Sequence, residues 1–198
     1  PISTSPPQIV TLPPNEEPSF RIANGTSSIT QALYKTLSPK QVLLNHPVRS
    51  ILKEGDYLRI NAKETSILAN TVISTLPPYL FVNTIECIPA LPEAIIELSN
   101  QTHTWMGESI KVGLSYKQPF WREGNNSGTI FSNVGPIPEM YDHTNKEDNR
   151  YALKGFLNGA YYSVSKEERL QMVLNQLKKY YGPKVENYLE YEEKVWAK

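Results

Sequence analysis

The sequence has very little cysteine, no excess of charge and no long apolar run, and each absence excludes a class of protein. A single cysteine, Cys87, cannot form a disulfide within the chain and weakly favours a reducing compartment. Lys and Arg together number 20, as do Asp and Glu, so nothing favours nucleic acid or an anionic membrane as a partner. No apolar run is long enough to span a bilayer, and the Pro-rich start (1–19) has none of the regions of a signal peptide.

The usual motifs of self-contained catalytic sites are also missing. The chain contains no G-x-G-x-x-G, G-x-x-x-x-G-K-[ST] or G-x-S-x-G motif, so it encodes neither these phosphate cradles nor a serine nucleophile elbow. The three histidines are scattered, and none stands at metal-ligand spacing from Cys87, so no metal site is predicted. Cys87 is interpreted as a small buried hydrophobe, and the EYEEK segment (190–194) as a solvated strand edge rather than a carboxylate pair.

The first half of the chain contains signals for a short strand, a turn, a helix and a β-meander. Residues 20–37 predict a strand, a turn at Asn24-Gly25 and a helix that Thr26 or Ser27 can cap. Polar turns then separate short apolar runs between 41 and 75, which is typical of a meander. Pro77-Pro78 is expected to end the last strand, because proline removes a hydrogen-bond donor.

The second half alternates strands with two helices. The Ser165–Glu168 capping box and the Gly182-Pro183 pair predict the limits of the longer helix. The aromatic pairs at 120–121, 161–162 and 180–181 are expected to pack in the core, because no basic stripe surrounds them. The other predicted elements are a helix over 92–102 and strands over 109–117, 129–133, 151–159 and 185–196. This order predicts an α+β protein: a mixed β-sheet with flanking helices, plus a small β-meander.

One strand has a particularly regular pattern. In GESIKVGLSYKQPFWREG (107–124), apolar residues from Ile110 to Tyr116 alternate with a polar set that contains Lys111. The pattern alone makes Lys111 a solvent-facing strand lysine.

Several segments, taken together, resemble the flavin-containing amine oxidase family, which includes monoamine oxidases, polyamine oxidases and L-amino-acid oxidases. They follow the family order from about residue 20 to 196, nearly the whole chain. The matching segments are FRIANGTSSITQAL, NHPVRSI, NTVISTLPPYL, IPALPEA, MGESIKVGLSYKQPFWRE, SKEERLQMVLNQLKKYYG and YEEKVW. The family's double-glycine turn is replaced here by Ala23-Asn24-Gly25, where Asn tolerates left-handed geometry.

The resemblance implies roles for five residues. Lys111 would face the flavin of FAD and assist its reoxidation by O₂. Val48 and Thr75 would contact the same cofactor. Tyr141 and Phe131 would line the cavity for a small amine substrate.

The resemblance also implies a domain organisation. Residues 1–19 would be an extended lead, 20–80 part of the FAD domain and 81–198 most of the substrate domain. The Rossmann-type start and the glycine-rich end of the family are not found here, so this chain is expected to be a central fragment of a cytoplasmic oxidase. Alone it is expected to be inactive and to bind FAD weakly, and homo-oligomer formation stays open.

Two alternatives remain at this point. The first is another flavin oxidase of the same superfamily, a desaturase or a protoporphyrinogen-type enzyme whose substrate carries no amine. The second is a stand-alone α+β binding module without redox activity.

Overall fold

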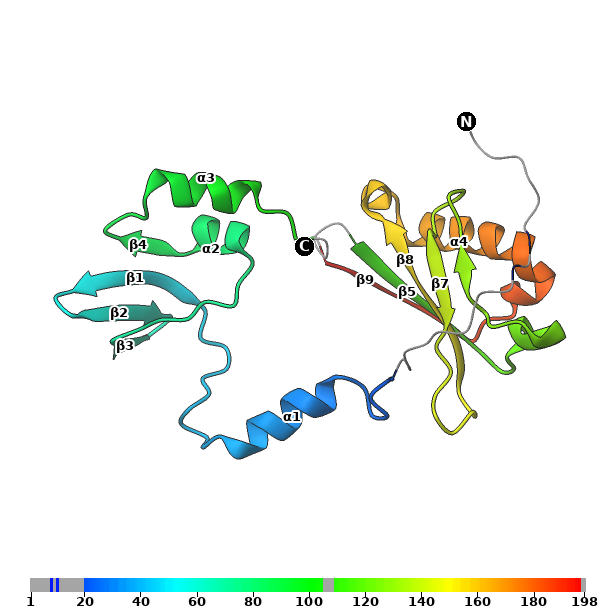
Figure 1. Cartoon of the computed structure of the whole chain (residues 1–198), viewed down its shortest axis with the longest axis horizontal. Helices are drawn as coiled ribbons and strands as arrows, with labels where there is room; N and C mark the ends of the chain where they lie inside the picture. The colour runs from blue at the N-terminus through cyan, green and yellow to red at the C-terminus, as the bar shows by residue number, and fades with distance from the viewer. Residues whose placement is uncertain (1–7, 9, 11–19, 105–108, 197–198) are drawn as a thin grey trace. The chain divides into compact units, whose positions relative to one another are not determined.

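The computed structural model describes residues 8, 10, 20–104 and 109–196, which form two compact units (Figure 1). The first unit is Thr26–Thr104, and the second consists of the described residues before 26 and after 104. The division into an FAD-domain segment (20–80) and a substrate domain (81–198) stays a prediction. Among the described residues, no helix combines the length and the apolar character needed to cross a membrane.

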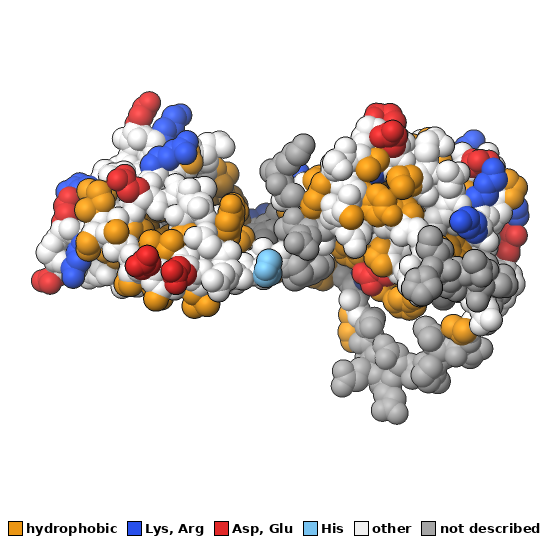
Figure 2. Space-filling model, turned by 90° about the horizontal axis from the view of Figure 1, so that it is seen from above, with side chains coloured by type: hydrophobic (Ala, Val, Ile, Leu, Met, Phe, Trp, Pro, Cys, Tyr) orange, Lys and Arg blue, Asp and Glu red, His pale blue; other side chains and the backbone are white. Residues whose placement is uncertain are grey.

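The first unit contains the predicted meander within a four-stranded mixed sheet. Strands β1, β2 and β3 are antiparallel, and β4 adds to β1 in parallel, giving the order β3-β2-β1-β4. The elements are α1 (Ser27–Thr36), β1 (Val48–Glu54), β2 (Tyr57–Ala62), β3 (Thr65–Ala69), α2 (Pro78–Thr84), β4 (Glu86–Ile88) and α3 (Glu93–Gln101). Apolar side chains lie among polar ones on the surface of this unit (Figure 2), and they include Leu33, Ile67 and Leu98.

Several local expectations for this region need correction. No strand forms at 20–22, and the turn follows at 23–24, where Gly25 N–H donates to the Ile22 carbonyl at 2.9 Å. Thr26 stands at the N-cap of α1 but its side chain accepts no capping hydrogen bond. Residues 41–47 and 71–75 form no strand. Pro78 begins α2, because N–H groups in the first turn of a helix have no acceptor within the helix, so the N–H that proline lacks costs no hydrogen bond there.

The second unit is an antiparallel sheet covered on one face by a long helix. Its five strands have the order β6-β7-β8-β5-β9, and α4 lies along one face (Figure 1). The elements are β5 (Ser109–Tyr116), η2 (Phe120–Asn125), β6 (Ile130–Phe131), β7 (Glu139–Asp142), β8 (Tyr151–Asn158), η3 (Gly159–Tyr161), α4 (Lys166–Tyr181), η4 (Gly182–Glu186) and β9 (Glu190–Val195). The predicted strand at 129–133 is reduced to β6, and β7 was not predicted.

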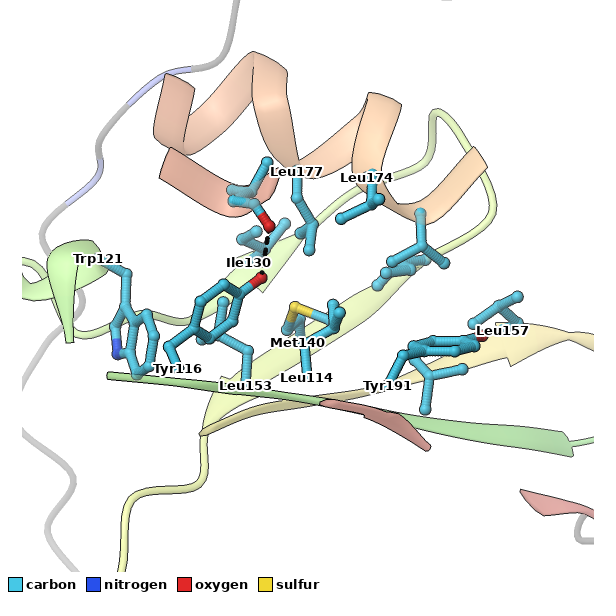
Figure 3. Packing of buried hydrophobic residues seen from close by; sticks show 14 of the residues in the cluster. Leu114, Tyr116, Trp121, Ile130, Met140, Leu153, Leu157, Leu174, Leu177 and Tyr191 are labelled. Atoms are coloured by element: carbon cyan, nitrogen blue, oxygen red, sulfur yellow. Dashed lines mark hydrogen bonds between the residues drawn. The ribbon is translucent and has the colours of Figure 1, made fainter. Parts of the chain in front are cut away.

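The core lies between α4 and the sheet. The alternation of β5 is confirmed, because Ile110, Val112 and Leu114 are buried. Figure 3 shows side chains of α4 directed toward those of the sheet; they include Leu174 and Leu177 on the helix and Leu114, Met140 and Leu153 on the strands. The aromatic pairs pack in or against this core as predicted. The Tyr116 hydroxyl donates to the Val185 carbonyl at 3.0 Å, and burial raises the pKa of Tyr116.

The limits of α4 follow from its capping residues. The Ser165 hydroxyl accepts from Glu168 N–H at 3.2 Å, and the Glu168 carboxylate accepts from Ser165 N–H at 3.2 Å, which is the predicted capping box. The helix ends at Gly182, whose positive φ of 72° suits glycine. The predicted helix is therefore confirmed at both ends.

The EYEEK segment differs from its expectation at Glu193. The segment does form an edge strand, β9, but the Glu193 side chain is only 6% exposed and forms a bidentate ion pair with Arg169 of α4, itself 8% exposed. Glu193 also accepts from the Tyr191 hydroxyl at 2.9 Å, and Arg169 donates to the carbonyls of Tyr161 and Val164. Glu193 thus links β9 to α4 through a buried ion pair.

Candidate functional site

The sheet face opposite α4 carries a continuous row of side chains across all five strands. Backbone pairing joins Phe131 to Glu139, Glu139 to Phe156, Phe156 to Lys111, and Lys111 to Lys194. Because neighbours in register project from the same face of a sheet, these residues form one surface. We call them the cross-strand row.

Lys111 lies at the aromatic part of this row. Lys111 is half-buried, and its ammonium is 5.6 Å from the ring centres of both Phe156 and Trp196. Lys154 also lies over Phe156, at 5.3 Å, and Lys194 over Trp196, at 5.6 Å. Within the described residues Lys111 forms no ion pair, and its ammonium lies within cation–π distance of two aromatic rings.

The other end of the row combines aromatic rings with a carboxylate. The rings of Phe131 and Tyr141 meet edge to face, with centres 6.0 Å apart. The Tyr141 hydroxyl donates to Glu139 Oε2 at 2.9 Å. Burial raises the pKa of Tyr141, and the hydrogen bond to the Glu139 carboxylate raises it further. The sequence pattern does not reveal Glu139, because the short strand β7 follows Pro136 and Pro138 and is not among the predicted strands.

A shallow depression of about 480 Å³ begins beside Lys111. Its floor includes Gly113 of β5, and His143 and Lys154 also line it. A Cβ atom built on Gly113 would meet nothing nearer than the Leu153 carbonyl oxygen at 4.0 Å. The missing side chain of Gly113 therefore helps to create the space, and strand packing does not require the glycine.

Asp142 fixes the end of β7 and so the position of Tyr141. Its carboxylate accepts from Trp121 Nε1 at 2.9 Å, from Arg122 Nε at 2.6 Å and from Thr144 N–H at 2.8 Å. Burial alone would raise the pKa of Asp142, but these hydrogen bonds outweigh it and lower the pKa to about 2. Asp142 is therefore a charged anchor for the strand that carries Tyr141.

The five residues assigned by resemblance fall in both units. Lys111, Phe131 and Tyr141 share the open sheet face of the second unit. Val48 is half-buried at the start of β1, and Thr75 is exposed in an irregular segment, both in the first unit. The first three are thus brought together, and the roles of all five stay predictions.

The fold is that of solved amine oxidases. The structure matches wild-type putrescine oxidase bound to putrescine with a TM-score of 0.79 and 32% identity, over 87% of this chain and 39% of that chain. It also matches cyclohexylamine oxidase from Brevibacterium oxydans with a TM-score of 0.77, at 24% identity and over 87% of this chain and 38% of that chain, a likeness of fold.

The family of this chain is shown by sequence comparison. Residues 6–198 match the family described as flavin containing amine oxidoreductase, and the chain belongs to it. A probable flavin-containing monoamine oxidase A of Dictyostelium discoideum is 30% identical over 89% of this chain and 39% of its own length. Putrescine oxidase of Kocuria rosea is 29% identical over 82% of this chain and 36% of its own length. The chain thus spans about two fifths of the length of these relatives.

The cofactor of this family is FAD, and the second unit fits its ring end. A planar ring that gains electrons is suited by aromatic faces and by a nearby cation, and the described surroundings of Lys111 offer both. The chain has no glycine-rich phosphate motif, so its residues offer nothing comparable for the pyrophosphate.

Proposed function

We propose that this chain acts within an FAD-dependent amine oxidase that converts an amine and O₂ to an imine and H₂O₂, the imine then hydrolysing to a carbonyl compound. FAD, when bound, accepts a hydride from the carbon that bears the amine and transfers the two electrons to O₂. The cross-strand row carries this proposal, because it places Lys111 among aromatic rings on an open face.

The residues of this chain are proposed to position the cofactor and the substrate and to stabilise developing charge. Lys111 is proposed to place a positive charge where O₂ gains electrons, because a fixed cation stabilises developing negative charge in a site that excludes water. Phe131 and Tyr141 are proposed to form the walls for the carbon chain of the substrate. Val48 and Thr75 are proposed to contact the cofactor from the first unit.

The location and assembly of the protein are further parts of the proposal. A single cysteine supports the reducing cytoplasm. Self-association into a homo-oligomer is tested by light scattering of the purified protein, and a monomer at micromolar concentration would contradict it.

The activity is tested on the full-length protein that contains this chain. We expect a flavin absorption spectrum that an amine bleaches without air, and H₂O₂ release when air is admitted. If no amine in a broad panel bleaches the bound flavin, the proposal fails, and a flavin oxidase with another type of substrate takes its place. If the protein retains no flavin at all, the binding-module alternative is favoured.

The role of Lys111 is tested by Lys111→Met, with Lys117→Met as the matched control. Lys117 lies just beyond β5 and is exposed. We expect Lys111→Met to slow reoxidation of the reduced flavin by O₂ roughly 100-fold, the loss typical of a removed electrostatic group, while reduction by amine changes little. An unchanged rate of reoxidation in stopped-flow measurements would refute this role.

A further inference from the structure

The edge strand β9 carries several of the charged side chains that surround Lys111. Its alternation places Glu190, Glu192 and Lys194 on the open sheet face, with Lys194 directly opposite Lys111 in the register. Trp196 follows the end of β9, and its ring centre is 5.6 Å from the ammonium groups of both lysines. The surroundings of Lys111 therefore depend on where β9 lies.

Backbone pairing holds β9 from one side only. The strand stands at the end of the strand order and pairs with β5 alone among the described strands. Lys111 and Lys194 carry like charges at directly opposed positions, and their repulsion works against the pairing of the two strands. A further restraint is therefore needed to keep Lys194 and Trp196 beside Lys111.

The buried ion pair on the core side of the sheet supplies this restraint. Glu193 precedes Lys194 and faces the core, where Arg169 of α4 donates to both of its carboxylate oxygens. Arg169 also donates to the carbonyls of Tyr161 and Val164, so four hydrogen bonds fix its guanidinium. Apolar packing is not directional, whereas a bidentate pair fixes the position of the strand relative to the helix.

We propose that Arg169 is a positioning residue for Lys111, on which it acts through the strand β9. By fixing Glu193, Arg169 keeps the ring of Trp196 beside the lysine and so limits the positions that the ammonium can take. The inference rests on the proposed function, because it concerns the charge that assists reoxidation of the flavin. A displacement of about 1 Å can remove much of the effect of such a positioned group.

The experiment compares Glu193→Gln with Gln176→Leu in the full-length protein. The glutamine at 193 keeps the shape of the side chain and removes its charge. Gln176 is the matched control, because it is also buried on α4 but bonds to the backbone of Val134 and Ile137 instead of β9. Hydrogen exchange of the backbone amides of 190–195 reports how firmly β9 is held. We expect exchange there to become roughly 10-fold faster in Glu193→Gln only, because a charge-assisted hydrogen bond is weakened.

The second measurement is reoxidation of the bound flavin by O₂ in stopped flow, below the melting temperature of every variant. The flavin is reduced with dithionite, so the measurement needs no amine. We expect Glu193→Gln to slow reoxidation about 10-fold, less than Lys111→Met because the ammonium is still present, and Gln176→Leu to leave the rate unchanged. Combined with Lys111→Met, Glu193→Gln should slow reoxidation no further, since both changes act through the same charge.

Arg169→Lys examines the same step from the helix. It keeps the positive charge but loses the bidentate geometry, so we expect both faster exchange in 190–195 and slower reoxidation. An unchanged result in either measurement for both Glu193→Gln and Arg169→Lys would overturn the inference. Equal losses in Gln176→Leu, or a further loss when Glu193→Gln is added to Lys111→Met, would overturn it too.

The remaining outcomes separate this inference from the proposed function. Normal reoxidation in Lys111→Met overturns the role of Lys111 and, with it, the positioning role of Arg169. A flavin that dithionite reduces but no amine reduces overturns the proposed amine oxidation alone. A full-length protein that retains no flavin overturns both.

Discussion

Breaking the buried ion pair between Arg169 and Glu193 should destabilise the second unit more than any single surface change. Both side chains are less than one tenth exposed, and together they engage Tyr191 and two backbone carbonyls. Replacing Arg169 by Met leaves a buried carboxylate without its counter-charge. Such losses cost about 3–5 kcal/mol, a large part of the roughly 5–15 kcal/mol that stabilises a whole domain.

The assay is urea unfolding of Arg169→Met, Glu193→Leu and the double variant, followed by near-ultraviolet circular dichroism of the aromatic core. We expect each single variant to lose about 3–5 kcal/mol, and the double variant to lose much less than their sum, because it leaves no unpaired charge. Additive losses, or a single-variant loss below about 1 kcal/mol, would refute this account of the pair.

The same pair predicts a dependence on pH. Burial raises the pKa of Glu193, but the hydrogen bonds from Arg169 and Tyr191 and the charge of Arg169 lower it more, so the net pKa lies below its ordinary value. A lowered pKa in the folded state adds stability above the unfolded pKa, which is about 4.3 for Glu. That stability is lost as the pH falls through the folded pKa, and Glu193→Leu should lose less on acidification than the unmodified protein.

Two further predictions concern the open sheet face. Asp142→Asn should cost about 2 kcal/mol of unfolding free energy at neutral pH, since the folded pKa of Asp142, about 2, lies below the unfolded value. The cost should shrink as the pH falls from about 4 toward 2. An equal cost at pH 3 and pH 7 in urea unfolding would contradict this. Gly113→Val should leave the melting temperature unchanged or raised, because strand packing leaves room for a side chain at this position. The new side chain should fill the depression and so weaken the binding of flavin or amine. Full activity with unchanged KM would contradict the placement of the site there.

The elements that sequence predicts well are those with local signals. Helix α4 has a capping box at its start and a glycine with positive φ at its end, and each signal involves only a few neighbouring residues. Strand β5 has strict alternation, because one face contacts the core and the other does not. The resemblance adds the family and a set of site residues, which no local pattern provides.

The errors have equally local causes. The prolines at 77–78 predict the end of a strand, but Pro78 is compatible with the first turn of α2, which begins there. Strand β7 is only four residues long and follows Pro136 and Pro138, so it lacks the length that makes alternation visible. Glu193 stands at the core-facing alternation of β9, with Tyr191 and Val195, although its charge favours solvent. Its partner Arg169 lies 24 positions earlier, beyond any periodic signal.

The site itself depends on register, which a single strand cannot encode. Alternation places Lys111 on a polar face, but Phe156 and Glu139 join it only because β8 pairs with β5 and with β7 in one particular alignment. A slip of one residue in β8 would turn Phe156 into the core and bring Leu157 outward, which burial of Leu157 at 2% exposure opposes. The hydrophobic core thus sets the register, and the register brings the residues of the cross-strand row together. It follows that a core substitution in β8 can displace the cross-strand row without changing any of its residues.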